Sequence, residues 1–146
     1  MLNSRRGSLN RNRRNEEVVL KNQQTIKTEA SYAGVGLHTG NKTKITFKPA
    51  PINTGIIFKR VDIPDSPEIK ADVDHVVDIS RGTTIGIGAV KIHTVEHVLA
   101  AVSGLEIDNI FCEVDGNEPP VGDGSSLPFV EVLLKAGIIE QEALRD

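Results

Sequence analysis

Two histidines and a glutamate lie close together in the sequence and could perform hydrolytic chemistry. His93, Glu96 and His97 have the spacing H-x-x-E-H, which one class of zinc peptidases uses. In that arrangement the two imidazoles bind zinc from one face of a helix, and the carboxylate polarises a water molecule. Taken alone, the pattern favours a structural role, in which Glu96 stabilises a helix N-terminus and the histidines are partly exposed polar residues.

The residues around this group predict the helix that would position it. Thr94 is expected to be the N-cap, Glu96 favours the positive end of the helix dipole, and the following apolar run ends at Gly104. With Thr94 as N-cap, His93 would precede the helix and would not share a face with His97. The zinc-peptidase arrangement therefore conflicts with the predicted helix start.

Most of the remaining chain has the composition and alternation of strands. Val and Ile together far outnumber Leu, and β-branched residues favour pleated sheet. Strands are expected at 42–48, 56–61 and 109–114, and a hairpin over 81–92. A second helix is expected from Ser125 or Ser126, with Pro128 in its first turn, to Gly137. This order predicts an α+β fold with a small mixed sheet and two helices packed on one face.

Charge divides the chain into two parts. Residues 1–14 hold five arginines and no acidic residue, so a net charge of −3 for the whole chain leaves −8 on the rest. We expect residues 1–22 to be a basic, disordered tail that makes at most weak contact with an anionic membrane surface. The acidic remainder argues against nucleic acid as a partner.

Other features limit the class of protein. No apolar run approaches the 18 residues that a membrane-spanning helix requires. A single cysteine, Cys112, excludes an internal disulfide framework and suits a reducing compartment, and its strand position predicts a core thiol. The polar residues 140–146 are expected to begin a linker, which makes 23–139 the folded domain.

Several motifs, in order, resemble one enzyme family. The resemblance runs from about residue 24 to residue 139 and rests on motifs of three to seven residues: GVGLHTG at 34–40, NTG at 53–55, RVD at 60–62, TVEH at 94–97, IDN at 107–109, DGS at 123–125 and PFV at 128–130. The chain is similar in these positions to the first domain of bacterial UDP-3-O-acyl-N-acetylglucosamine deacetylases. Several motifs in one order are far more specific than any single one.

The resemblance implies a fold and an activity. The fold would be that of domain 2 of ribosomal protein S5, present twice in the family with the active site between the two copies. The activity would be cytoplasmic, zinc-dependent removal of the acetyl group from UDP-3-O-acyl-N-acetylglucosamine, in lipid A biosynthesis. Because this chain resembles the first domain, the second domain would be its partner, and the chain alone is expected to be inactive.

The resemblance also implies roles for individual residues. Glu96 matches the family's general base and His97 matches a zinc ligand, whereas the position of His93 is not a ligand. His38, in the glycine-rich loop, and Thr83, in a strand edge beside the family's acyl channel, are expected to bind substrate. The other zinc ligands would belong to the second domain.

Two other functions remain open from the residues alone. One is a zinc peptidase built on His93, Glu96 and His97, which the substitution His93→Ala would distinguish because only a peptidase would lose its metal. The other is a non-enzymatic binding domain on the S5-like scaffold. The acidic body and the scarcity of aromatic residues for base stacking argue against a nucleic-acid-binding form of it.

Overall fold

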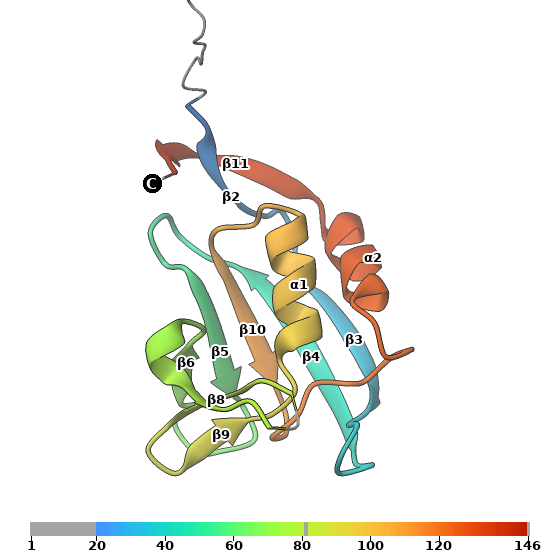
Figure 1. The fold of residues 1–146 in the computed structure, drawn as a ribbon. Coiled ribbons are helices and arrows are strands. Elements are labelled where there is room, and N and C mark those ends of the chain that lie inside the picture. The colour runs from blue at the N-terminus through green and yellow to red at the C-terminus, as the bar shows by residue number, and fades with distance from the viewer. Residues whose placement is uncertain (1–19, 81, 146) are drawn as a thin grey trace, which may run out of the picture.

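A five-stranded sheet with both helices on one side forms the body of the protein (Figure 1). The computed structural model describes residues 20–80 and 82–145. The strand order is β3-β4-β10-β5-β6, in which β10 and β5 are parallel and the other neighbours are antiparallel. The strands are β3 (Ala30–Val35), β4 (Lys42–Pro49), β10 (Ile110–Val114), β5 (Ile56–Arg60) and β6 (Glu68–Lys70). The predicted α+β class and mixed sheet are confirmed.

The two faces of this sheet differ in polarity because side chains alternate along each strand. In the central register Cys112 lies opposite Phe47 on one side and Phe58 on the other, and all three are fully buried. The opposite face carries the ion pair between Lys48 and Glu113, at 3.2 Å. The apolar face is therefore the one that the helices cover, and the predicted core position of Cys112 is confirmed.

Helices α1 (Glu96–Gly104) and α2 (Leu127–Ala136) close the core. The ring of Phe129, on α2, packs edge-on against Tyr32 and Phe47, with centroid distances of 5.6 and 6.5 Å. Each helix places three residues in the core: Val98, Ala101 and Val102 from α1, and Phe129, Leu133 and Ala136 from α2. Pro128 lies in the first turn of α2 and Gly137 follows its end at a φ of +83°, as the sequence predicts.

The C-terminal residues form a strand where a linker was expected. Strand β11 (Ile138–Leu144) pairs antiparallel with β2 (Asn22–Ile26), so the expected change from domain to linker at residue 140 is wrong in its local structure. No residue of the strand is fully buried, and it is stabilised by backbone pairing and by polar contacts. Gln141, for example, donates a hydrogen bond to the carbonyl of Ala50 at 2.9 Å. The predicted basic tail spans residues 1–22. Residues 1–19 lie outside the described residues, whereas Leu20, Lys21 and Asn22 are described, and Asn22 already belongs to β2.

A separate three-stranded sheet borders the N-terminus of α1. It consists of β7 (Val76–Asp78), β8 (Thr84–Ile87) and β9 (Val90–Ile92), preceded by the short 3₁₀ helix η1 (Val73–His75). Strands β8 and β9 form the predicted hairpin, which turns at Gly88 with a φ of +58°. Among the described residues, no helix combines the length and the apolar character needed to cross a membrane.

Candidate functional site

The start of helix α1 is set by a strained threonine. Thr94 is buried and has a φ of +59°, a left-handed conformation that β-branched residues rarely adopt. The helix begins at Glu96, after Val95, and has no side-chain cap. The predicted N-cap role of Thr94 is therefore wrong. Its hydroxyl donates instead to Oε2 of Glu118, at 2.9 Å, because this buried carboxylate is close enough to compete for it.

The Glu96 carboxylate lies against a glycine and a backbone amide. The N–H of Thr83 donates to Oε1 of Glu96 at 2.9 Å. Gly82 has a φ of +102°, and a Cβ at this position would lie 2.7 Å from Oε2 of Glu96. The glycine thus leaves the space that the carboxylate occupies. Thr83, which the sequence predicts to bind substrate, contacts Glu96 through its backbone.

His97 follows Glu96 in the first turn of α1 and is partly exposed. Adjacent residues on a helix point about 100° apart, so the two side chains reach neighbouring regions of space at this helix end. The hydroxyl and backbone N–H of Ser125 hold the pKa of Asp123 below its usual range, and the nearby His97 imidazole adds a smaller lowering.

His93 lies before the helix and has other partners. Its backbone N–H donates to the carbonyl of Asn117 at 2.7 Å, and its Nδ1 lies 3.0 Å from the hydroxyl of Thr84. Because α1 begins only at Glu96, His93 and His97 do not share a helical face. The arrangement that a zinc peptidase of the H-x-x-E-H type needs is not formed.

His38 and His93 line a common cavity of about 380 Å³. The loop that carries His38 connects β3 to β4, and the other wall comes from the three-stranded sheet through Asp78, Ser80 and Thr84. The structure thus brings the predicted substrate residue His38 to the side of the site where His93 lies. Thr83 does not line this cavity; its neighbour Thr84 does.

Glu118 was not identified from the sequence, yet it connects two parts of the site. Only 2% of its surface is exposed. Its carboxylate accepts hydrogen bonds from the backbone N–H groups of His38 and Thr39, at 3.0 and 3.3 Å, and from the hydroxyl of Thr94. No periodicity indicates this role, because Glu118 lies in the irregular segment between β10 and α2 and two of its three partners are about 80 residues away. The neighbouring Pro119 and Pro120 were the only local sign of a structured loop.

The donor atoms present allow only part of a metal site. A hydrolytic zinc site uses about three protein ligands. No group of three or more His, Cys, Asp or Glu side chains that could hold a metal ion is found within 20–80 and 82–145. The imidazole of His97 fits one ligand position, and the described residues do not complete the set.

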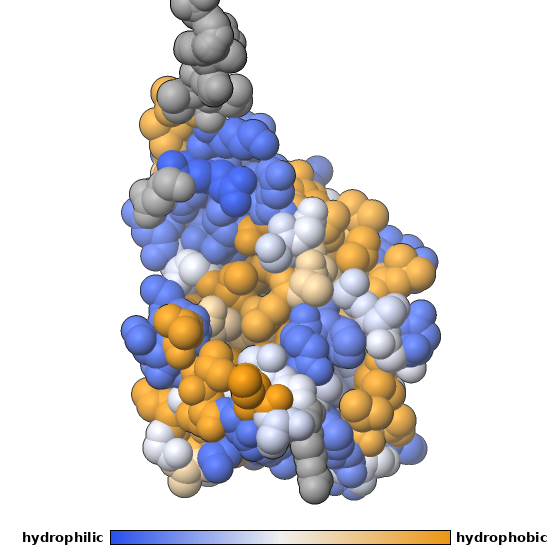
Figure 2. All heavy atoms as spheres, viewed as in Figure 1, coloured by the Kyte–Doolittle hydropathy of each residue, from blue (hydrophilic) through white to orange (hydrophobic). Residues whose placement is uncertain are grey.

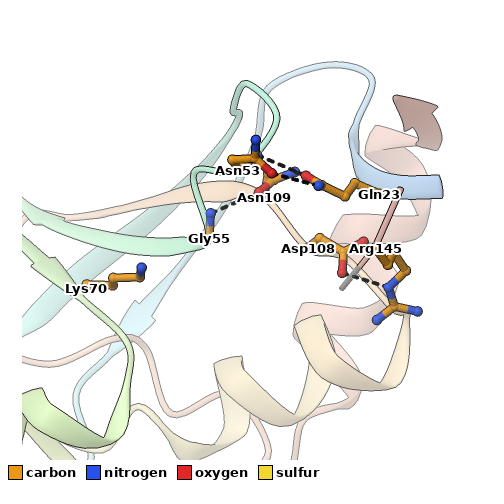
Figure 3. A pocket seen from close by; sticks show the side chains of 7 residues that line it. All are labelled: Gln23, Asn53, Gly55, Lys70, Asp108, Asn109 and Arg145. Carbon is orange, nitrogen blue, oxygen red and sulfur yellow. Dashed lines mark hydrogen bonds and ion pairs between the residues drawn. The ribbon is translucent and has the colours of Figure 1, made fainter. Parts of the chain in front are cut away.

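A second cavity, of about 440 Å³, lies at the opposite end of the sheet (Figure 3). Its polar side chains bond to one another. The amide of Asn109 donates to Gln23 and Gln141, both at 2.8 Å, and accepts from the N–H of Gly55 at 2.9 Å. Arg145 pairs with Asp108 at 2.9 Å. These contacts fasten β2 and β11 to the body of the domain, which explains the cavity as a structural feature.

The model of the LpxC family, UDP-3-O-acyl N-acetylglycosamine deacetylase, matches residues 23–146. The chain therefore belongs to this deacetylase family.

The names of individual relatives refer to the same family. The chain is 64% identical over 124 residues to the "Bifunctional enzyme LpxC/FabZ" of Chlorobaculum tepidum, a match that covers 85% of this chain and 27% of the relative. It is 48% identical over 121 residues to the UDP-3-O-acyl-N-acetylglucosamine deacetylase of Thioalkalivibrio sulfidiphilus, covering 83% and 40%. The deacetylase of Bdellovibrio bacteriovorus is 46% identical over 123 residues, covering 84% and 41%. The chain thus spans less than half the length of these relatives.

Proposed function

We propose that this chain is the first domain of a zinc-dependent deacetylase that hydrolyses the acetamide of UDP-3-O-acyl-N-acetylglucosamine in the cytoplasm, during lipid A biosynthesis. We assign its fold to the type of domain 2 of ribosomal protein S5. The observation that carries the proposal is the pair Glu96–His97 at the start of α1, with the Glu96 carboxylate held by Thr83 in a chain of the deacetylase family.

In this proposal Glu96 is the general base. Its Oε1 accepts the Thr83 N–H, which fixes the orientation of the carboxylate. Oε2 takes a proton from the water that attacks the acetamide carbonyl. When the C–N bond breaks, Glu96 returns the proton to the sugar nitrogen, and the products are the free amine and acetic acid, which then ionises to acetate. Zinc, when bound with His97 as one ligand, would polarise the carbonyl and lower the pKa of water.

The remaining expected residues lie on segments connected to the start of α1: Thr83 contacts Glu96, and the His38 loop shares Glu118 with Thr94. We assign His38 to substrate binding because it lines the cavity beside His93. For Thr83 the assignment to substrate binding rests on the position of its backbone next to Glu96. Both assignments place the substrate between the β3–β4 loop and the three-stranded sheet.

A second domain is the partner that this proposal requires. The described residues offer one imidazole where about three ligands are needed, so the chain alone is expected to bind zinc weakly and to have no deacetylase activity. Apolar side chains also gather over the outer face of α2 and over the three-stranded sheet (Figure 2). On α2, Leu127 and Leu134 are 53% and 56% exposed, which supports a partner that covers this face.

A zinc titration of the 146-residue chain, followed by NMR, tests the proposal. We expect the ring resonances of His97 to shift, His97→Ala to abolish the response, and His93→Ala and His75→Ala to retain it. His75 is the matched control because it bonds to Asp72 away from α1. A response that depends on His93 and not on His97 would contradict the proposal. Deacetylase turnover by the chain alone would contradict the requirement for a second domain.

A further inference from the structure

Two segments that contribute to the proposed site meet at one buried carboxylate. Glu118 accepts the N–H of His38, in the β3–β4 loop, and the hydroxyl of Thr94, two residues before Glu96. Figure 1 shows that the β3–β4 loop, the start of α1 and the end of β10 lie at the same end of the sheet. A single side chain therefore contacts both the loop of the proposed substrate residue and the start of the proposed catalytic helix.

The β3–β4 loop is shaped around this carboxylate. A Cβ on Gly36 would lie 2.4 Å from Oε1 of Glu118, so only glycine allows the backbone to approach so closely. The loop closes on itself through the N–H of Gly36, which donates to Asn41, and the N–H of Gly40, which donates to Gly36. This closure directs the N–H groups of two consecutive residues, His38 and Thr39, at the carboxylate.

On the other side, Glu118 holds a strained backbone. The left-handed conformation of Thr94 turns the chain from β9 into α1. Such strain persists only where the surroundings fix it. Here the flanking residues are also bonded, His93 to Asn117 and Val95 to Thr83, and the Thr94 hydroxyl bonds to Glu118. The carboxylate thus helps to set where α1 begins and, through it, the position of Glu96.

A carboxylate suits these partners better than an amide would. All three groups that converge on Glu118 are donors, and an ionised carboxylate accepts only. Hydrogen bonds to a charged acceptor are stronger than neutral ones, and a buried charge is costly unless it is bonded in this way. A glutamine would place an NH₂ group against donors.

We infer that Glu118 is a positioning residue, which fixes the His38 loop and the start of helix α1 relative to each other. The inference rests on the proposed function only for the roles of Glu96 and His38. The coupling of the two segments through Glu118 does not depend on it. Coupling of this kind keeps the substrate and the general base in register, which matters because small misplacements reduce rates strongly.

NMR on the 146-residue chain tests the coupling. We expect Glu118→Gln to shift the amide resonances of His38, Thr39 and Thr83 and to raise their hydrogen exchange at least tenfold. The matched control is Asp115→Asn, in the same segment. Asp115 also accepts a threonine hydroxyl and a backbone N–H, from Thr43 and Lys44 of β4. The Asp115→Asn variant should leave the amide resonances and exchange rates of His38, Thr39 and Thr83 unchanged when its overall stability equals that of Glu118→Gln.

Substitutions of Thr94 test the direction of the effect without burying a new group. Thr94→Val replaces the hydroxyl with a methyl group of similar size, so Glu118 loses this donor, and it should shift the His38 amide across the carboxylate, whereas Thr94→Ser should not. Thr94→Gly, combined with Glu118→Gln, relieves the left-handed strain and should restore the Thr83 amide but not the His38 amide. The inference is overturned if Glu118→Gln has no more effect than Asp115→Asn, or if Thr94→Val leaves His38 unchanged.

These readouts need neither zinc nor turnover. A zinc response that depends on His93 and not on His97 would therefore overturn the proposed function alone, and unchanged amides would overturn only the positioning role.

Discussion

Glu96 occupies space that any side chain at residue 82 would fill. The Cβ of an alanine there would meet both carboxylate oxygens, at 2.7 and 3.2 Å, and the φ of +102° is itself unfavourable for an L-residue. The position of the Glu96 carboxylate thus depends on a residue that has no side chain. Gly88, in the neighbouring hairpin, allows the effect of backbone strain to be separated from that of steric contact. It has a φ of +58°, but a Cβ there would have no atom within 4 Å.

Gly82→Ala is expected to lower the free energy of unfolding by about 2–5 kcal/mol, since the backbone strain costs roughly 1–2 kcal/mol and the overpacking roughly 1–3 kcal/mol. Gly88→Ala should cost only the strain, about 1–2 kcal/mol. Urea denaturation measures both. Gly82→Ala should also shift the Thr83 amide in NMR spectra, and an unshifted amide would show that the carboxylate does not depend on this glycine.

The Arg60–Asp62 pair supports the sheet beside the site. The guanidinium bonds to both carboxylate oxygens of Asp62, at 2.8 and 2.7 Å, and a third nitrogen donates to the carbonyl of Lys91 in β9. The hydrogen bond from Arg60 holds the pKa of Asp62 below its usual range. A carboxyl whose pKa is lower in the folded state stabilises the fold above its unfolded pKa, about 3.9.

Asp62→Asn should therefore lower stability at pH 7, and the difference from the unsubstituted chain should shrink as the pH falls through the lowered folded pKa of Asp62. Urea denaturation at a series of pH values between 7 and about 2.5 measures this difference. The sequence offers Asp65 as a control position, in the turn that follows. A difference that stays constant over the whole range would show that the charge of Asp62 does not contribute.

For individual residues, sequence patterns predicted the roles that depend on neighbours in the chain. They did not predict the roles that depend on partners far away in the sequence. The helix that carries Glu96 and His97 follows from a local apolar run and its glycine end. The N-cap expected at Thr94 failed because the distant Glu118 takes the hydroxyl. Glu118 itself has no local signature, since the loop that it binds is about 80 residues away.

Among the elements, β11 was expected to be a linker, and β2, β3 and β6 were not predicted as strands. Residues 140–142 of β11 are polar, which is typical of a linker. The stability of β11 comes from its pairing with β2, at the other end of the described chain, and from Asn109, which is 98% buried and bonds to Gln23 and Gln141. Strands β4, β5 and β10 and both helices could be predicted because each carries its own apolar pattern.

Asn109→Ala is expected to destabilise the domain by about 2–3 kcal/mol, because it removes three hydrogen bonds, which join the buried Asn109 amide to Gln23, Gln141 and the N–H of Gly55. Asn22→Ala is the matched control. The Asn22 side chain makes one exposed, 3.5 Å contact with Glu140, so its loss should change stability by less than about 0.5 kcal/mol. Chemical denaturation measures both, and hydrogen exchange should show the added opening in β2 and β11. Equal effects of the two substitutions would argue against a special role for Asn109.

For the molecule as a whole, the exposed apolar surface on α2 is the feature that bears on its association with other molecules. Leu127 and Leu134 lie two helical turns apart, so they project from the same side of the helix. Surfaces of this kind usually mark a contact with another protein or domain. In the isolated chain they are free to associate with each other.

Leu134→Lys is expected to reduce concentration-dependent self-association of the 146-residue chain in sedimentation velocity. Stability should change by no more than about 0.5 kcal/mol, because the side chain is mostly exposed. Val73→Lys, on η1 and 83% exposed, is the control for a general effect of added charge. If both variants reduce association equally, the face of α2 has no special part in it.

Strand β11 also brings the two ends of the described chain together: the N–H of Arg145 donates to the carbonyl of Lys21 at 2.8 Å. A short glycine-serine peptide could join these ends, and the ring could be reopened at the Asp65–Ser66 turn, where both residues already have positive φ. Such a circular permutant would keep every strand pairing. Fluorescent labels or affinity tags attached near residues 20 or 145 should likewise leave the Glu96 region accessible, because this edge lies at the far end of the sheet from the start of α1 (Figure 1).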